Sequence, residues 1–146
     1  EKMQEYKDGQ IVIEDDKILY VGKPKEFDSI DNIVDAKNCL VLPGMVNTHC
    51  HVSMLPFRSL QDDCPDRLRR FLFPLENACM NEDLAYYGAC YGAGEMLLSG
   101  ITTFADMYYF MDKVALACEK NGNTCCSRRN ELLISQPVMQ KMQLKH

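Results

Sequence analysis

Short apolar runs separated by polar turns fill the first forty or so positions of the chain. Ile11–Ile13 and Ile18–Val21 lie on either side of the polar loop Glu14–Lys17. Two such runs across a short polar loop predict a β-hairpin. Val34–Ala36 and Cys39–Leu42 indicate further short strands. The N-terminal part of the chain is therefore predicted to be β-structure.

The clearest helical pattern covers residues 81–99. Asn81 is a suitable N-cap, and the acidic residues that follow it favour the positive end of the helix dipole. Large apolar side chains then recur at helical intervals, and we interpret them as the face that packs into the core: Leu84, Tyr87, Tyr91 and Leu98. Gly100 is expected to end this helix.

After this helix the sequence predicts one more strand and one more helix. Ile101–Ala105 is β-branched and aromatic, which predicts a strand. Met111–Lys120 is a second amphipathic helix, followed by Gly122. Alternating strands and helices predict an α/β fold with parallel strands. Asp106, at the end of the strand, is expected to cap the next helix, and a role in orienting a histidine is the alternative.

Two of the three histidines lie at the end of one apolar stretch, Val41–His51. We interpret this stretch as a buried strand. His49 and His51 are two positions apart, so a strand points their side chains in the same direction. Two imidazoles at one point can begin a metal site, although zinc takes about four ligands in all. Two histidines bonded to backbone carbonyls would give the same pattern.

Composition limits the class of protein. The chain has 146 residues, of which 47% are hydrophobic and 25% are charged, as expected for one small folded domain. The net charge of -5 argues against nucleic acid or an anionic membrane as a partner. No apolar run reaches the roughly 18 residues of a membrane span. No signal peptide is visible, and because the chain begins with Glu1 we expect its true start to lie upstream.

The eight cysteines are scattered through segments that we expect to be helical or buried. A disulfide framework has a tighter and more regular spacing. Reduced cysteines in a cytoplasmic protein are therefore the better interpretation.

One longer motif resembles a known family. Leu42-Pro43-Gly44-Met45-Val46-Asn47-Thr48-His49-Cys50-His51 resembles the P-G-x-(I/V/L)-(N/D)-x-H-x-H signature of the metal-dependent amidohydrolases. The similarity continues through Arg58, Phe73–Glu76, Glu95–Met96 and Gly100–Tyr108. This longer pattern resembles the branch that holds the 5-methylthioadenosine/S-adenosylhomocysteine deaminases and the related chlorohydrolases. The resemblance covers roughly residues 8–122.

The resemblance implies an α/β fold in which a small β-sandwich accompanies a metal-dependent (β/α)8 barrel. We expect part of the sandwich at residues 1–43, the first βα units of the barrel at 44–122 and an atypical tail at 123–146. A complete barrel needs about 250 residues. The chain is therefore expected to be a truncated, N-terminal portion of such an enzyme.

The resemblance also implies a chemistry, the hydrolytic deamination of purine nucleosides with release of ammonia. His49 and His51 would hold a divalent metal, zinc or alternatively iron, and Glu76 would contact the ribose hydroxyls. Local sequence alone explains Glu76 equally well as an acidic residue near a helix start. The family's other metal ligands and its general acid/base come from later strands, so no catalytic residue is assigned. Turnover by this chain alone is not expected.

Three classes of function stay open from the sequence. The first is the deaminase of methylthioadenosine, adenosylhomocysteine or a related nucleoside. The second is an amidohydrolase acting on another ring, such as a triazine chlorohydrolase or a guanine-type deaminase. The third is a non-catalytic remnant that binds a partner. The oligomeric state is not determined by the sequence.

Residues 123–146 have no hydrophobic period and are rich in Gln, Lys and Met. The family continues at this point with a strand similar to I-R-A-V-V-G-E-T and a loop similar to F-P-x-x-D-A-K. The codons of residues 123–131 permit the first segment in one shifted frame, and those from Ile134 onward permit F-P-A-S-D-A-K-N-A-A-E-A in the other. We interpret the tail as a frameshift product, with a genuine divergent tail as the alternative. The nucleotide sequence of the gene distinguishes the two.

Overall fold

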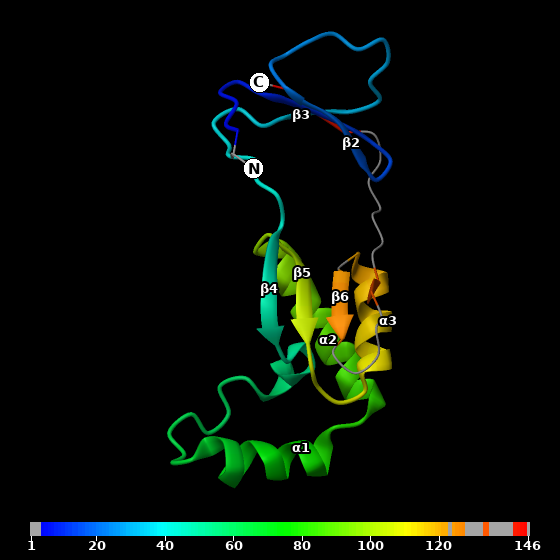
Figure 1. Cartoon of the computed structure of the whole chain (residues 1–146). Coiled ribbons are helices and arrows are strands. Elements are labelled where there is room, and N and C mark those ends of the chain that lie inside the picture. Colours follow the sequence, from blue (N-terminus) through cyan, green and yellow to red (C-terminus); the bar gives the residue numbers. More distant parts are fainter. Residues whose placement is uncertain (1–3, 123, 128–132, 135–141, 146) are drawn as a thin grey trace. The chain divides into compact units, whose positions relative to one another are not determined.

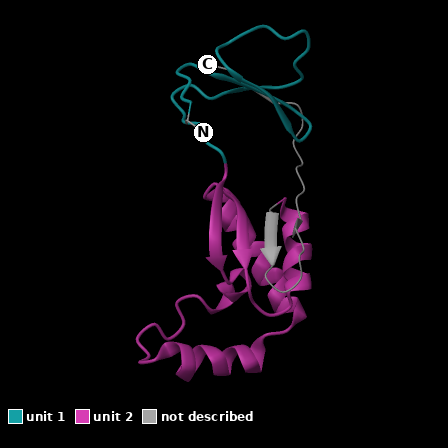
Figure 2. Cartoon of the chain, viewed as in Figure 1, with its two compact units in different colours: residues 1–43, 137–146 teal, residues 44–136 magenta. Residues whose placement is uncertain are grey.

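The computed structural model describes residues 4–122, 124–127, 133–134 and 142–145 (Figure 1). The chain divides into two compact units (Figure 2). Unit 1 comprises Glu1–Pro43 and Pro137–His146, and unit 2 comprises Gly44–Gln136.

Unit 1 contains a four-stranded sheet in the order β2-β1-β8-β3. Its strands are β1 (Gln10–Glu14), β2 (Lys17–Gly22), β3 (Ile33–Asp35) and β8 (Met142–Lys145). β1 and β2 pair antiparallel, which confirms the predicted hairpin. β8 lies between β1 and β3, antiparallel to the first and parallel to the second. This long-range insertion was not predicted.

The strand predicted at Cys39–Leu42 is wrong. These residues carry no strand assignment, and Leu40 and Leu42 are exposed. A strand requires a neighbour that satisfies its backbone groups. Within the described part of unit 1, the sheet does not extend to this segment.

Unit 2 is built on a second four-stranded sheet, in the order β4-β5-β6-β7. Its strands are β4 (Met45–Cys50), β5 (Ile101–Asp106), β6 (Thr124–Ser127) and β7 (Leu133–Ile134). β4, β5 and β6 pair in parallel, and β7 is antiparallel to β6. Parallel strands need helical crossovers, so this arrangement confirms the α/β character predicted from the sequence.

The helical elements of unit 2 connect these strands. A 3₁₀ segment η1 (Val52–Phe57), a π-helical segment η2 (Leu68–Leu72) and α1 (Phe73–Cys79) precede the long helix α2 (Glu82–Leu98). Helix α3 (Met111–Asn121) joins β5 to β6. Helices α2 and α3 lie side by side against the sheet (Figure 1).

The ends of α2 follow the predicted signals. The Asn81 side chain accepts a hydrogen bond of 2.9 Å from the backbone N–H of Leu84, as an N-cap residue does. Gly100 follows the helix with a φ of +80°, and Gly122 follows α3 with a φ of +75°. These left-handed conformations favour glycine, which explains why both helices end where the sequence predicted.

The predicted buried face of α2 is wrong. Tyr87 and Tyr91 are 67% and 65% exposed, and Leu98 is also exposed. The buried side of the helix instead carries small residues: Ala85, Gly88, Ala89, Gly92 and Ala93.

The close approach of η1 explains this choice of face. A Cβ atom on Gly88 would lie 2.8 Å from the backbone oxygen of Ser53, and one on Gly92 would lie 2.7 Å from Val52 Cγ2. Large side chains cannot occupy this face, so the small residues pack against η1, β5 and α3. Ala89, Ala93, Phe104 and Val114 belong to the resulting core.

β4 was expected to be buried, and this expectation is also wrong. The strand lies at the edge of its sheet, and Val46 is 62% exposed. Its start is nevertheless tightly held against β5. A Cβ atom on Gly44 would lie 2.1 Å from Thr102 Oγ1, so only glycine fits at this position of the Pro-Gly turn.

The atypical tail predicted at 123–146 lies mostly outside the described residues, which include its backbone only in β6, β7 and β8. Among the helices that the structure describes, none combines the length and apolar character needed to cross a membrane.

Candidate metal site

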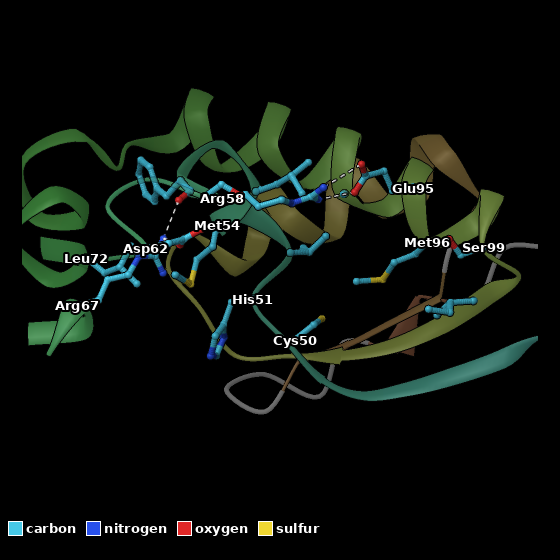
Figure 3. A pocket seen from close by; sticks show the side chains of 16 residues that line it. Cys50, His51, Met54, Arg58, Asp62, Arg67, Leu72, Glu95, Met96 and Ser99 are labelled. Carbon is cyan, nitrogen blue, oxygen red and sulfur yellow. Dashed lines mark hydrogen bonds and ion pairs between the residues drawn. The ribbon is translucent and has the colours of Figure 1, made fainter. Parts of the chain in front are cut away.

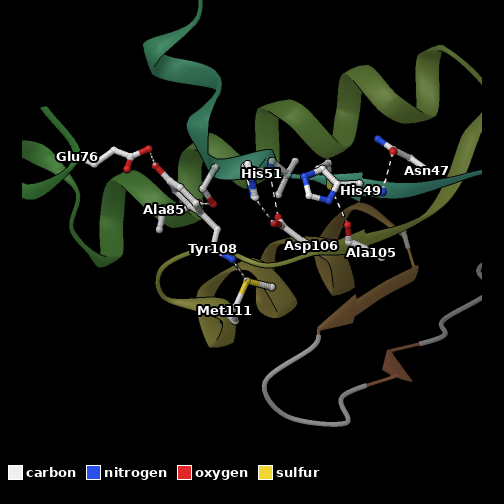
Figure 4. Close-up of polar contacts among 12 residues, drawn as sticks. Asn47, His49, His51, Glu76, Ala85, Ala105, Asp106, Tyr108 and Met111 are labelled. Atoms are coloured by element: carbon white, nitrogen blue, oxygen red, sulfur yellow. Dashed lines mark hydrogen bonds and ion pairs between the residues drawn. The ribbon is translucent and has the colours of Figure 1, made fainter. Parts of the chain in front are cut away.

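The two histidines of the motif lie next to each other at the C-terminal end of β4. Their ring centroids are 5.1 Å apart in an edge-on arrangement (Figure 4). His49 is exposed and His51 is partly buried. The alternation of side chains along β4 therefore brings the two imidazoles together as the spacing predicted.

Asp106 lies behind His51 at the end of the neighbouring strand. The register of the sheet places Cys50 opposite Asp106. Asp106 Oδ2 accepts a hydrogen bond of 3.0 Å from the backbone N–H of Val52, the residue after His51. Asp106 Oδ1 lies 3.8 Å from His51 Nδ1. The carboxyl group thus holds the backbone that carries His51 and faces one nitrogen of its ring.

The expectation that Asp106 caps the next helix is wrong. Helix α3 begins after Phe110, which makes no side-chain capping bond. Within the described residues, His51 Nδ1 and Asp106 Oδ1 are both buried without a hydrogen-bond partner. Their separation of 3.8 Å exceeds a hydrogen bond. The structure therefore favours the alternative, in which Asp106 orients a histidine.

Burial dominates the electrostatics of Asp106. Its removal from water raises the pKa of the Asp106 carboxyl above its ordinary value. The backbone donors at Val52 and Met107 and the nearby His51 oppose this shift without cancelling it.

Glu76 reaches the same region from the first turn of α1. Its side chain is buried, with the residue only 5% exposed. The Tyr108 hydroxyl donates a hydrogen bond of 2.7 Å to Glu76 Oε1. The Tyr108 ring in turn lies 5.6 Å, centroid to centroid, from the ring of His51. Tyr108 thus links Glu76 to the histidine pair, as Figure 4 shows.

The sequence did not single out Tyr108 as a functional residue. Burial and the Glu76 carboxylate raise the pKa of Tyr108, so its hydroxyl stays protonated and remains a donor. Tyr108 comes two residues after the end of β5, the strand beside β4. This position at the C-terminal end of a parallel strand is the signal that would have identified it.

His51 also lines a hollow of about 590 Å³ (Figure 3). Residues of η1, η2 and α2 line it, among them Arg58 and Glu95. The guanidinium of Arg58 binds the Glu95 carboxylate through two hydrogen bonds. This pairing compensates the charges of Arg58 and Glu95 in the hollow.

The histidine pair does not by itself complete a metal site. Across the described residues, no cluster of three or more His, Cys, Asp or Glu side chains is arranged to hold a metal ion. The arrangement provides two adjacent imidazoles, a buried carboxyl group behind one of them and a second buried carboxylate nearby.

Comparison with known proteins gives a consistent pattern. The sequence profile of the amidohydrolase family matches residues 40–136. A 5'-deoxyadenosine deaminase of Methanobrevibacter smithii is 42% identical over 116 residues, which are 78% of this chain and 26% of the relative. A 5-methylthioadenosine/S-adenosylhomocysteine deaminase of Syntrophus aciditrophicus is 40% identical over 130 residues, which are 86% of this chain and 29% of the relative.

Solved structures show the same fold. An atrazine chlorohydrolase from Arthrobacter aurescens in complex with zinc superimposes with a TM-score of 0.70 at 23% identity. The match covers 80% of this chain and 30% of that enzyme. The chain thus spans between a quarter and a third of the length of the proteins that it matches.

Proposed function

The chain belongs to the amidohydrolase family, and from this premise we propose that it supplies the N-terminal part of a metal-dependent deaminase of purine nucleosides. The substrates are 5-methylthioadenosine, S-adenosylhomocysteine or a similar nucleoside, and ammonia is released. The histidine pair at the end of β4, with the buried Asp106 facing His51 Nδ1, is the observation that carries this proposal.

The proposal includes the finer architecture. The parallel β4, β5 and β6 with their helices would be the opening units of a (β/α)8 barrel, and the sheet of unit 1 would be part of a β-sandwich. Parallel pairing through helical crossovers and the family match support this assignment. The scattered spacing of the cysteines along the sequence supports a reducing, cytoplasmic location.

His49 and His51 would hold a divalent ion, zinc or alternatively iron. The donor set fits, because the Nδ1 of His51 faces a carboxyl group and its Nε2 is left as the ligand atom. Such an ion acts as a Lewis acid and lowers the pKa of a water molecule toward about 7. The protein's own contribution here would be orientation, since Asp106 holds the backbone after His51 and faces Nδ1 of its ring.

Glu76 would bind the sugar of the nucleoside. A buried carboxylate is a strong acceptor for hydroxyl groups, and the Glu76–Tyr108 hydrogen bond holds it near His51. This feature favours a nucleoside over the triazine ring of the chlorohydrolases, because a triazine offers no pair of hydroxyls to such an acceptor. The triazine alternative therefore rests on the shared fold alone.

Metal binding and ammonia release test the proposal together. For the 146-residue chain we expect weak zinc binding and no ammonia from 5-methylthioadenosine, because a catalytic zinc site normally has three protein ligands. Replacing both His49 and His51 by Ala should abolish the zinc binding. Tyr87→Phe, on the exposed face of α2, is the matched control and should leave it unchanged.

A chimera supplies the positive test. In it, the matching part of this chain replaces the equivalent segment of the M. smithii 5'-deoxyadenosine deaminase. We expect ammonia release from 5'-deoxyadenosine, and its loss when His49 and His51 are replaced. Full activity of the doubly substituted chimera would show that the histidine pair does not hold the metal.

A further inference from the structure

The outer face of α2 carries a stripe that stays exposed in the described part of unit 2. Its positions follow one another at alternating steps of three and four residues: Leu84, Tyr87, Tyr91, Gly94 and Leu98. Both tyrosines and Leu98 are exposed, whereas η1, β5 and α3 pack against the helix elsewhere. This spacing of large apolar residues is that of the seam between two packed helices. The stripe therefore has the pattern of a contact face.

The apolar surface continues from α2 onto η1. A recess of about 430 Å³ lies between the two elements. Leu84, Tyr87 and Tyr91 line it from α2, and Leu55 and Pro56 line it from η1. An apolar surface of this extent on a folded chain marks a site of protein–protein interaction.

The stripe is symmetrical about Tyr91. Leu84 and Leu98 each lie seven positions from it, Tyr87 lies four positions before it and Gly94 three positions after it. If two copies of α2 pack antiparallel with Tyr91 at the twofold axis, Leu84 meets the partner's Leu98 and Tyr87 meets the partner's Gly94. A Cβ atom on Gly94 would have no atom within 4 Å, so there is room for an incoming ring. The face is thus complementary to itself in shape.

The charged residues beside the stripe also suit an antiparallel pair. Arg58 and Glu95 lie on the flank of α2 that faces η1, and their ion-paired side chains are partly exposed (Figure 3). In an antiparallel pair the same flanks of both helices meet, so the two ion pairs come together. Arg58 has five N–H donors, and its two bonds to Glu95 leave others available. These donors can bind the partner's Glu95, which gives a network of alternating charge.

We propose that the outer face of α2 is a dimer interface, and that its occupant is the same face of a second copy of this chain. A twofold, self-complementary contact is the commonest way in which identical chains associate. The two tyrosines and Leu98 offer roughly 400 Å² per copy, half of a standard interface. The dimer is therefore weak, with a dissociation constant on the order of 100 µM. The inference does not depend on the proposed function, because it uses no residue of the histidine site.

Sedimentation velocity of the 146-residue chain tests the proposal, at concentrations from about 10 µM to 1 mM and under reducing conditions. All samples carry Val46→Lys, because the exposed edge strand β4 is another route to association and a charge opposes it. The variants are Tyr87→Ala, Gly94→Tyr and the combination of both. Leu116→Ala is the matched control, since Leu116 is an exposed leucine on α3, outside the stripe.

The parent chain should dimerise as its concentration increases. Each single substitution should weaken dimerisation by about 10-fold or more, Tyr87→Ala because it removes a ring and Gly94→Tyr because its ring collides with the partner's Tyr87. The combined variant exchanges the large and the small residue, so its dissociation constant should return to within about 3-fold of the parent value. Leu116→Ala should leave dimerisation unchanged.

Any of four results would overturn the inference. The first is a parent chain that stays monomeric at every concentration. Stronger association of Gly94→Tyr would show that added apolar surface, rather than a fitted contact, drives association. Failure of the combined variant to recover would exclude the antiparallel arrangement about Tyr91. Equal weakening by Leu116→Ala would assign the contact to another face. Circular dichroism verifies the fold of each variant, and Gly94→Gln, which also fills the space, replaces Gly94→Tyr if that variant has unfolded.

Discussion

At the residue scale, the main feature beside His51 is a buried carboxyl group that is only partly hydrogen-bonded. The Asp106 carboxyl group is buried and hydrogen-bonded to the backbone through Oδ2, while Oδ1 faces an imidazole nitrogen just beyond hydrogen-bond distance. The charged form of such a group is costly to bury, because no hydrogen bond among the described residues compensates Oδ1.

The raised pKa of Asp106 predicts a pH-dependent stability. The folded state binds the proton more tightly than the unfolded state, so the contribution of Asp106 is fully present below its unfolded pKa of about 3.9. It is lost as the pH rises through the folded pKa. We therefore expect the metal-free protein to lose stability relative to Asp106→Asn as the pH is raised from about 4 to 7.

Urea unfolding of both proteins in the presence of a chelator measures this difference. The other titrating groups are the same in both proteins, so their contributions cancel when the two unfolding free energies are subtracted at each pH. A difference in unfolding free energy that is independent of pH would show that the carboxyl group is not buried in this way.

At the scale of elements, α2 is the helix that positions the site. Its small residues let η1 approach closely, and η1 follows directly from His51. Gly92 and Gly94 lie near each other on α2 but face different surroundings. A Cβ atom on Gly92 would meet Val52, whereas one on Gly94 would have no atom within 4 Å.

Alanine substitutions at these two glycines should have opposite effects. Gly94→Ala should stabilise the protein by about 0.5–1 kcal/mol, because alanine favours the helix and meets no neighbour. Gly92→Ala should destabilise it by about 1–3 kcal/mol through overpacking against Val52. Urea unfolding provides the measurement. A stabilising effect at both positions would mean that η1 does not pack against α2 as described.

At the scale of the whole molecule, much apolar surface is exposed. The edge strand β4 exposes Met45 and Val46, and α2 exposes two tyrosines and Leu98. A long exposed edge with apolar side chains is a template for association with another chain.

We accordingly expect the isolated chain to self-associate as its concentration increases. Val46→Lys places a charge on the open edge of β4 and should reduce this association. Sedimentation velocity over a range of concentrations provides the measurement. Association that is unaffected by the lysine would assign it to another surface, and Tyr87→Gln on α2 would then be the variant to compare.

Much of this protein could be predicted from local sequence. The hairpin of unit 1, the limits of α2 and α3 and the strand β5 follow from apolar periodicity and capping residues, which act over a few neighbouring positions. The proximity of His49 and His51 follows in the same way from the alternation of side chains along a strand. These features depend only on local geometry.

Other features were decided by contacts between distant segments. The large residues of α2 formed a plausible core face, yet the close approach of η1 selected the small face instead. Asp106 looked like a helix cap until the pairing of β5 with β4 placed it behind His51. The link from Glu76 to Tyr108 joins two segments 32 residues apart, and no local pattern encodes it. The sequence by itself determined most of the elements and the proximity of the two histidines. The tertiary structure decided which faces are buried and which side chains meet, because packing and burial depend on neighbours that only the fold brings together.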